Sequence, residues 1–411
     1  MAAWLAASGA VTSNLRLRAP PALATNCAAM MARQRSVRSR IRAVCDAARR
    51  WSDGDFPPRV RTLAAIVERT GYSEPVAEYA LDRLFSSISN DALAQAIVSE
   101  LGSLDVLDGF VEREGVRIRA VAAGRACVIS SRTTIGVAIV PAVFAICADS
   151  DLVVKDREDR LVSEFFKTLV EELPELRDRI EARAWDGESS EVDLHSFDTI
   201  VAFGDRPAIE RIRSQADPEC RFVSFGPRTS LGYVAREALV ERDAGDIAFG
   251  AARDALLYDT EGCLSLRTLF VERGGAISPE TFFAALRREV DRASIEFPPG
   301  SNRAQRMASL VAAHDLAAFR SANGRGAVAT DANRTYVVTF DPGLERPPEF
   351  VARTIAVHPV DGPQEARDYL TQHRLAVEAW SIAGARDDVV DAAVASGAVR
   401  IAAFGSLQDP P

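Results

Sequence analysis

Lysine is almost absent from this chain. Only two of its 49 basic residues, Lys155 and Lys167, are lysine, and the others are arginine. Histidine is also scarce, with four residues, and the six cysteines show no CxxC spacing. Zinc sites need clusters of such ligands at short spacing, so the sequence indicates no metal site. Scattered cysteines are typical of a reducing compartment, and we therefore expect a cytoplasmic protein.

The chain also lacks a hydrophobic run long enough to cross a bilayer. Its longest apolar run, residues 135–148, is shorter than the roughly 20 residues of a spanning helix and predicts a buried core segment. The formal net charge is −9, which argues against a general nucleic-acid binder. A local basic groove for phosphate groups is still compatible with that charge.

Acidic residues are missing from the N-terminal region, where the first is Asp46. The preceding 45 residues carry seven arginines among many alanines and serines, which is typical of an organelle transit peptide. A start codon assigned too far upstream, with true initiation at Met30 or Met31, is the alternative. The preference for arginine over lysine suggests a GC-rich coding sequence and favours that alternative. In either case we expect residues 1–35 to be a disordered leader or a mis-assigned start.

The pattern along the rest of the chain predicts an α/β protein of several domains. A length of 411 residues with 47% hydrophobic content is too large for one compact core. Helical periodicity predicts an N-terminal helical region at 36–110. Short apolar strands then alternate with helices, one of them predicted at 176–182, which indicates a mostly parallel sheet with helices on both faces. We expect a first sheet domain at 111–245, a second at 246–395 and a C-terminal segment at 396–411.

Cys263 is the most informative candidate for chemistry. It lies in Tyr258-Asp-Thr-Glu-Gly-Cys-Leu-Ser265, between an amphipathic helical stretch and a strand-like run. A thiol behind a glycine at such a junction can be exposed in a cleft and, if its pKa is lowered, can act as a nucleophile. The alternative is a packed core thiol.

Two motifs resemble a known family. Phe225-Gly-Pro-Arg-Thr-Ser-Leu-Gly-Tyr-Val234 and Asp259-Thr-Glu-Gly-Cys-Leu-Ser265 are similar, in order and spacing, to motifs of the aldehyde dehydrogenase superfamily and of its acyl-CoA (fatty acid) reductase branch. The resemblance runs from about residue 72 to residue 404. It implies two Rossmann-like parallel-sheet domains, with residues 111–245 binding a nicotinamide cofactor and the next domain carrying Cys263. It also implies an oligomerisation ribbon and hence a homo-oligomer.

The resemblance assigns a mechanism to these residues. Cys263 would displace coenzyme A or another acyl carrier from a thioester, and hydride from NADPH or NADH would then release an aldehyde. Relatives place an asparagine amide beside the oxyanion, whereas Thr133 or Arg132 falls there in this chain. Losing one oxyanion donor typically costs ~10²–10³ in rate. Ser224 stands where hydrolytic relatives have a glutamate, and a serine is a poor base, which favours transfer or reduction over hydrolysis. The alternative is that Ser224 only ends a strand.

The resemblance also assigns cofactor contacts. Lys155 and Glu158 resemble the turn that holds the adenosine ribose, and a surface ion-pair network is the alternative for them. Gly204 and Arg206 resemble the turn that faces the pyrophosphate, although a glycine after a strand is also an ordinary turn. Gly226, in the first motif, is the remaining cofactor contact that the resemblance implies.

Two functions follow from these residues. The first is an NAD(P)H-dependent reductase that converts an activated fatty acyl group to an aldehyde through an acyl-Cys263 intermediate. The second is a catalytically degenerate relative that binds or transfers acyl groups within a biosynthetic complex.

Overall fold

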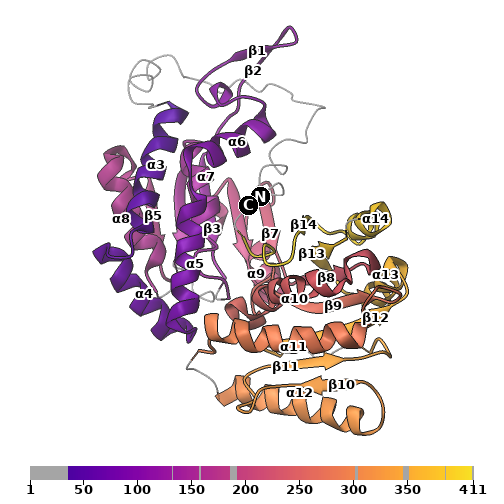
Figure 1. Ribbon diagram of the computed structural model, residues 1–411. Helices are drawn as coiled ribbons and strands as arrows, with labels where there is room; N and C mark the ends of the chain where they lie inside the picture. The colour runs from indigo at the N-terminus through magenta and orange to yellow at the C-terminus, as the bar shows by residue number, and fades with distance from the viewer. Residues whose placement is uncertain are drawn as a thin grey trace, which may run out of the picture.

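Two parallel sheets, each packed against helices, form the framework of the protein. The computed structural model describes residues 36–131, 133–156, 159–185, 192–300, 304–345, 351–384 and 386–409. The smaller sheet lies in the upper lobe of Figure 1 with the N-terminal helices, and the larger sheet lies in the lower lobe. The predicted leader, residues 1–35, lies outside the described residues.

The N-terminal helices form one core with the first sheet. They are α3 (Val37–Ser52), α4 (Pro57–Thr70), α5 (Glu74–Ser87) and α6 (Asn90–Leu101). The hydroxyl of Ser36 accepts a hydrogen bond from the N–H of Ser39 and thereby caps α3. Trp51, at the end of α3, is fully buried and packs against Phe165 of α8 (Leu161–Glu172). The predicted helical region is therefore present, but it is packed onto the sheet rather than separate from it.

The first sheet has five parallel strands in the order β5-β4-β3-β6-β7. Its strands are β3 (Arg125–Ile129), β4 (Asp151–Lys155), β5 (Ile180–Arg183), β6 (Thr199–Phe203) and β7 (Arg221–Phe225). The apolar run predicted as core forms α7 (Ile139–Cys147), which is almost wholly buried. Helix α9 (Arg206–Gln215) follows β6. Since strands β4 and β6 lie on opposite sides of β3, the strand order reverses there, which is where such sheets bind ligands.

The second sheet has seven strands in the order β10-β11-β12-β9-β8-β13-β14, all parallel except the β10–β11 pair. Its strands are β8 (Thr229–Val234), β9 (Leu266–Glu272), β10 (Ala327–Ala329), β11 (Val337–Phe340), β12 (Thr354–Val360), β13 (Val377–Ala383) and β14 (Arg400–Ala402). Its helices are α10 (Glu241–Leu256), α11 (Pro279–Glu296), α12 (Ala304–Ala322), α13 (Pro363–Gln372) and α14 (Asp387–Ala395).

Two sequence predictions need correction. The first domain does not extend to residue 245, because β8 pairs with β9 and β13 in the second sheet. The boundary lies in the short link between β7 and β8. The predicted helix at 176–182 is wrong as well: a 3₁₀ turn at Pro174–Leu176 leads into the edge strand β5, where pairing with β4 outweighs helical propensity.

An antiparallel hairpin projects from the top of the upper lobe (Figure 1). It is formed by β1 (Val111–Arg113) and β2 (Val116–Ile118), and it precedes β3 in the chain. Phe110, Val116 and Val121, in and beside it, are exposed apolar residues. The predicted oligomerisation ribbon would correspond to this hairpin and stays a prediction.

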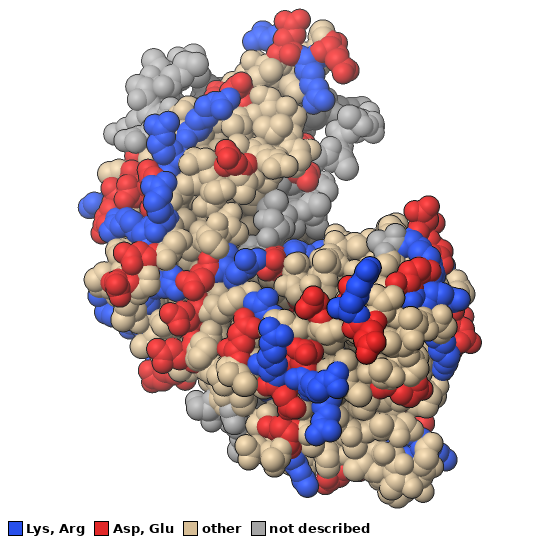
Figure 2. Space-filling model, viewed as in Figure 1, with Lys and Arg blue, Asp and Glu red and all other residues tan. Residues whose placement is uncertain are grey.

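The described surface is mixed in charge. Basic and acidic side chains alternate over the face shown in Figure 2 rather than separating into areas of one sign. Among the described helices, none has the length and apolar character that crossing a membrane requires.

Candidate active site

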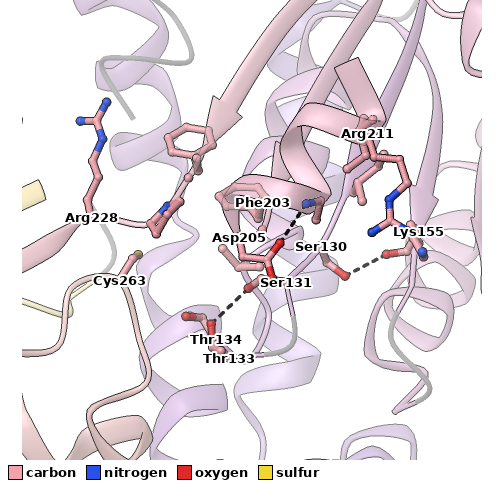
Figure 3. A pocket seen from close by; sticks show the side chains of 18 of the residues that line it. Ser130, Ser131, Thr133, Thr134, Lys155, Phe203, Asp205, Arg211, Arg228 and Cys263 are labelled. Atoms are coloured by element: carbon pink, nitrogen blue, oxygen red, sulfur yellow. Dashed lines mark hydrogen bonds between the residues drawn. The ribbon is translucent and has the colours of Figure 1, made fainter. Parts of the chain in front are cut away.

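A cleft of about 690 Å³ lies at the carboxyl edge of the first sheet. Four strands end in it, and the residues at or directly after their ends line it: Ser130 and Ser131 after β3, Lys155 of β4, Phe203 and Gly204 at β6, and Phe225 and Gly226 at β7. The second sheet contributes the opposite wall, with Arg228, Cys263 and Arg267. Figure 3 shows Cys263 facing Ser131, Thr133 and Asp205 from across the cleft.

Cys263 lies on a loop with an unusual backbone. Tyr258, Asp259 and Thr260 are three consecutive residues with positive φ, at 58°, 50° and 66°. Such residues are costly in the left-handed region and persist only where the surroundings fix them. Arg353 does so here, because its guanidinium donates a hydrogen bond of 2.9 Å to the carboxylate of Asp259 in a buried ion pair. The strained segment therefore ends three residues before the candidate nucleophile.

The thiol of Cys263 is exposed to solvent in the cleft, which places it where a nucleophile would have to be. The protein around it nevertheless displaces water, so that burial raises its pKa to about 11, with a further increase from the charge of Glu378. The N–H groups of Cys263 and Leu264 and the cation of Arg267 lower the pKa, but by less. A thiol with a pKa of about 11 is neutral near pH 7.

Two β-bulges flank strand β8 beside Cys263. In β13, Glu378 is the extra residue between Val377 and Ala379 opposite Ser230. In β9, Arg267 is the extra residue opposite the same part of β8. Bulges redirect side chains and are frequent next to active sites. Together they bring a carboxylate and a guanidinium into the electrostatic surroundings of Cys263.

Glu378 and Arg267 are both charged groups in low-dielectric positions. Glu378 pairs with Arg228 at 3.5 Å and is 15% exposed, and burial raises the pKa of its carboxyl group. Burial lowers the pKa of Arg267, whose Nε donates to the carbonyl oxygen of Thr260 at 3.2 Å. We did not predict either residue from the sequence, since neither belongs to a motif and only strand pairing brings them near Cys263.

Thr133 lies in the same cleft as Cys263, as expected of an oxyanion donor. Its hydroxyl is 3.5 Å from that of Ser131. The hydroxyl of Tyr72 lies 2.7 Å from the carbonyl oxygen of Thr133 and 3.1 Å from a carboxylate oxygen of Glu261, and so ties the Thr133 turn to the Cys263 loop. Arg132, the other candidate donor, lies outside the described residues.

Of the two residues predicted to contact the adenosine ribose, the structure describes one. Lys155 lines the cleft, and its ammonium lies 5.2 Å from the ring centroid of Trp185. Its carbonyl accepts a hydrogen bond of 2.9 Å from the Ser130 hydroxyl, which joins the ends of β3 and β4. Glu158 lies outside the described residues.

The turn predicted to face the pyrophosphate lies in the cleft, but its charged side chains are not arranged to bind a phosphate. Gly204 lines the cleft at the start of α9, but the carboxylate of Asp205 accepts a hydrogen bond of 2.9 Å from the N–H of Ala208 and caps the helix. A negative charge therefore occupies the position where a phosphate would be attracted. Arg206 is exposed and is not among the residues lining the cleft, whereas Arg211, one turn later in α9, does line it.

The remaining predicted residues lie on β7. Gly226 and Pro227 line the cleft directly after the strand. Ser224 is exposed and does not line it, so the hydroxyl does not take the place of a catalytic base. In the part of the chain that the structure describes, no cluster of three or more His, Cys, Asp or Glu side chains is arranged to hold a metal ion.

A second, apolar cavity of about 200 Å³ adjoins the cleft. Both are lined by Thr134, Val137, Phe203, Phe225 and Cys263. The rings of Phe203 and Phe225 are stacked, with centroids 4.6 Å apart, at this junction. Helices α5 and α7 supply much of the apolar wall, with side chains that include Leu84, Val140 and Phe144. Cys263 therefore lies where the larger, more polar cleft meets an apolar cavity.

Comparison with solved structures shows an aldehyde dehydrogenase-like fold. An NAD-dependent benzaldehyde dehydrogenase from Corynebacterium glutamicum matches with a TM-score of 0.68 and 15% identity, over 93% of this chain and 84% of that one. An NADP-dependent glyceraldehyde-3-phosphate dehydrogenase from Bacillus halodurans C-125, complexed with NADP, matches with a TM-score of 0.63 and 14% identity, over 90% and 79% of the two chains.

Comparison with curated proteins finds long-chain acyl-protein thioester reductases. The protein of Aliivibrio fischeri is 21% identical over 336 residues, which cover 79% of this chain and 67% of the relative. That of Photorhabdus luminescens is 22% identical over 233 residues, or 54% and 47%. The matches thus span about two thirds and about half of these relatives. The model of the acyl-CoA reductase (LuxC) family matches residues 32–410. With its cysteine-bearing cleft on an aldehyde dehydrogenase-like fold, the chain belongs to the acyl-CoA reductase (LuxC) family.

Proposed function

We propose that this protein reduces a fatty acyl thioester to an aldehyde through a covalent acyl group on Cys263, with NADH or NADPH as the reductant. One observation carries the proposal: Cys263 lines both the larger cleft of about 690 Å³ and the more apolar cavity of about 200 Å³. A nucleophile at that junction can receive an acyl chain from one side and a nucleotide from the other. The family match and the names of the curated relatives support the same chemistry.

The cleft has groups that fit a dinucleotide. Trp185, Val192, Leu194 and Ile212 line it as an apolar surface for a planar base. Lys155 and Arg211 supply positive charge for ribose and phosphate oxygens. A bound reduced nicotinamide would supply hydride to the acyl carbon. Asp205 opposes the phosphates, so we assign their binding to these two cations rather than to the α9 N-terminus.

The covalent step follows from the position of Cys263. Its sulfur attacks the thioester carbonyl carbon, the carbon–sulfur bond to the carrier breaks, and the carrier thiol leaves with the proton that Cys263 gives up. The N–H of Cys263 and the hydroxyl of Thr133 are the proposed donors to the oxyanion. With a bound reduced nicotinamide as hydride donor and a proton taken up from solvent, the acyl group on Cys263 would become a thiohemiacetal, whose carbon–sulfur bond would break to release the aldehyde and restore the Cys263 thiol.

The raised pKa of Cys263 makes deprotonation part of this proposal. Glu378 does not line the cleft, but it lies in the β13 bulge opposite Ser230, which bonds the Cys263 loop, and its charge acts on the thiol, so it is the proposed proton acceptor once substrate fills the cleft. Apo enzymes often hold catalytic groups further apart than the reacting complex does. Arg267 would then stabilise the thiolate that forms.

The acyl donor is a thioester, of coenzyme A or of a carrier protein. The family description names acyl-CoA, and the curated relatives are named as acyl-protein thioester reductases. We further propose that the protein forms a homo-oligomer through the β1–β2 hairpin and acts in the cytoplasm.

A second function is favoured by the carboxylate that caps α9. Asp205 weakens the phosphate site, and Thr133 stands where relatives have an amide, so a relative that only accepts and transfers acyl groups would show these features. That protein would keep the acyl-Cys263 step and lose the reduction.

Intact-protein mass separates the two functions. The protein and Cys263→Ala are incubated with acyl-CoAs and with acyl carrier protein thioesters, without cofactor. A mass gain equal to the acyl group, absent in the variant, is expected. Adding NADH or NADPH should then discharge the adduct as aldehyde. An adduct that survives both cofactors would indicate the transfer protein, and the absence of any adduct would overturn both functions.

A further inference from the structure

The wall of the apolar cavity includes the C-terminal segment of the chain, residues 405–409. Gln408 and Asp409 line the cavity together with Arg83 of α5, whereas none of the three lines the cleft. Arg83 and Asp409 are the charged side chains in this otherwise largely apolar lining, and they form an ion pair with each other. An ion pair in the wall of an apolar cavity has no role in the steps described above.

Buried contacts hold this segment in place. The carboxylate of Asp254 accepts hydrogen bonds from the N–H of Gly405 at 2.8 Å and from the N–H of Leu407 at 3.1 Å. The side chain of Leu407 is fully buried. Gly250 is needed for this approach, because a Cβ there would come within 2.7 Å of the Phe404 backbone. The segment is therefore an integral part of the core.

Gln408 connects the segment to the loop that carries Cys263. Its side-chain amide donates to the carbonyl of Asp254 at 2.9 Å and to the hydroxyl of Ser265 at 3.1 Å. A Cβ at Gly262 would lie 3.0 Å from the Gln408 side-chain oxygen. The chain end and the nucleophile loop thus pack directly on one another.

The Arg83–Asp409 pair marks where the cavity reaches the surface. The two side chains are 43% and 29% exposed, so the pair faces water on one side and the apolar lining on the other. A partly exposed ion pair contributes little to stability and is easily broken. A longer acyl chain, by contrast, gains hydrophobic free energy with each methylene that it buries. Opening this pair would therefore cost less than the hydrophobic free energy that a longer acyl chain could gain in the cavity.

We propose that Gln408 and Asp409 form part of the wall of the acyl cavity and that the Arg83–Asp409 ion pair in this wall sets the longest acyl chain that Cys263 accepts. This inference rests on the proposed function, since it assigns the apolar cavity to the acyl chain. It makes Arg83 and Asp409 specificity-determining residues, because they line the cavity assigned to the acyl chain and are not among the groups proposed to act on its carbonyl.

The test compares acyl chain lengths in three variants. Initial rates of Cys263 acylation are measured by intact mass with butyryl-, octanoyl-, dodecanoyl- and hexadecanoyl-CoA for the wild type, Arg83→Met and Asp409→Asn. Both variants should raise the hexadecanoyl-to-octanoyl rate ratio by at least about fourfold, the factor that one additional buried methylene contributes. Arg273→Met removes an exposed ion pair with Asp361, away from the cavity, and should leave the ratio unchanged.

Direct binding separates failure of this inference from failure of the proposed function. Fatty acids of the same lengths are titrated into the Cys263→Ala protein with and without Asp409→Asn. If the wild type is never acylated but Asp409→Asn still shifts the binding preference to longer fatty acids, the reductase proposal fails and the role of the Arg83–Asp409 pair in chain length is supported. If the preference for acyl chain length is unchanged in both assays, in variants that are folded, the proposed role of the Arg83–Asp409 pair is overturned.

Discussion

The hydroxyl of Ser230 donates a hydrogen bond of 2.8 Å to the carbonyl oxygen of Cys263. Ser230 is fully buried in β8 and lies opposite both bulges, so this bond joins the nucleophile loop to the strand that organises the charges around it. The position of Cys263 therefore depends on a side chain 33 residues away in the chain.

Replacing Ser230 by alanine should loosen the loop. The Cys263 carbonyl would lose its donor, so we expect the free energy of unfolding to fall by about 1–3 kcal/mol. The rate of Cys263 acylation should fall about tenfold or more, because small displacements of a reacting group are costly. Urea unfolding and intact mass measure the two effects. Ser86→Ala, an exposed serine of α5, is the matched control, and an unchanged acylation rate in Ser230→Ala would contradict the expectation.

The reactivity of Cys263 should depend steeply on pH. Its pKa is raised to about 11, so the thiol is protonated through the neutral range and the thiolate fraction increases as the pH approaches 11. Alkylation of Cys263 by iodoacetamide should therefore rise about tenfold per pH unit between pH 7 and pH 9. Peptide mass spectrometry isolates Cys263 from the other cysteines. A plateau already at pH 8 would show that the thiol pKa is low instead.

Glu378→Gln should make Cys263 more reactive in the free protein. The charge of Glu378 raises the thiol pKa, so removing it lowers that pKa and increases the alkylation rate at pH 8 several-fold. Turnover should move the opposite way if Glu378 accepts the proton, since glutamine cannot. Glu237→Gln, an exposed carboxylate at another site, serves as the control. Parallel changes in alkylation and turnover would contradict the assigned role.

Arg353→Met should destabilise the protein strongly. The variant leaves the buried carboxylate of Asp259 without its partner, at a cost of about 3–5 kcal/mol. The double variant Arg353→Met/Asp259→Asn should lose less stability than the sum of the losses in the two single variants, because the pair acts as a unit. Thermal unfolding with Arg273→Met as the surface control measures this. If the stability lost in the double variant equals the sum of the losses in the two single variants, the pair is not coupled.

Asp205→Ser should improve cofactor binding. Serine still caps α9, while the negative charge that opposes the phosphates is removed. A charge at a helix terminus contributes roughly 0.3–1 kcal/mol, so NADPH and NADH should bind about two- to fivefold more tightly. Calorimetric titration measures the dissociation constants. If the variant binds neither cofactor more tightly, the phosphates do not bind near Asp205.

The local sequence was sufficient for the class of fold and for the candidate nucleophile. Alternating apolar strands and helices predicted a mostly parallel sheet covered by helices, and the family resemblance implied two such domains. The glycine-preceded turn favoured an accessible Cys263 over a packed core thiol. Thr133, Lys155, Gly204 and Gly226 line the same cleft as that cysteine. All of them lie at strand ends or in turns, where short-range signals are strong.

Only the tertiary structure decided which charges surround Cys263. Glu378 and Arg267 are ordinary residues in sequence, and each depends on one extra residue in its pairing with β8. The assignment of β8 to the second sheet, and the return of Gln408 to the nucleophile loop, are likewise contacts between distant segments. Strand register and long-range packing are set by the whole core rather than by local propensity, so no local pattern reports them.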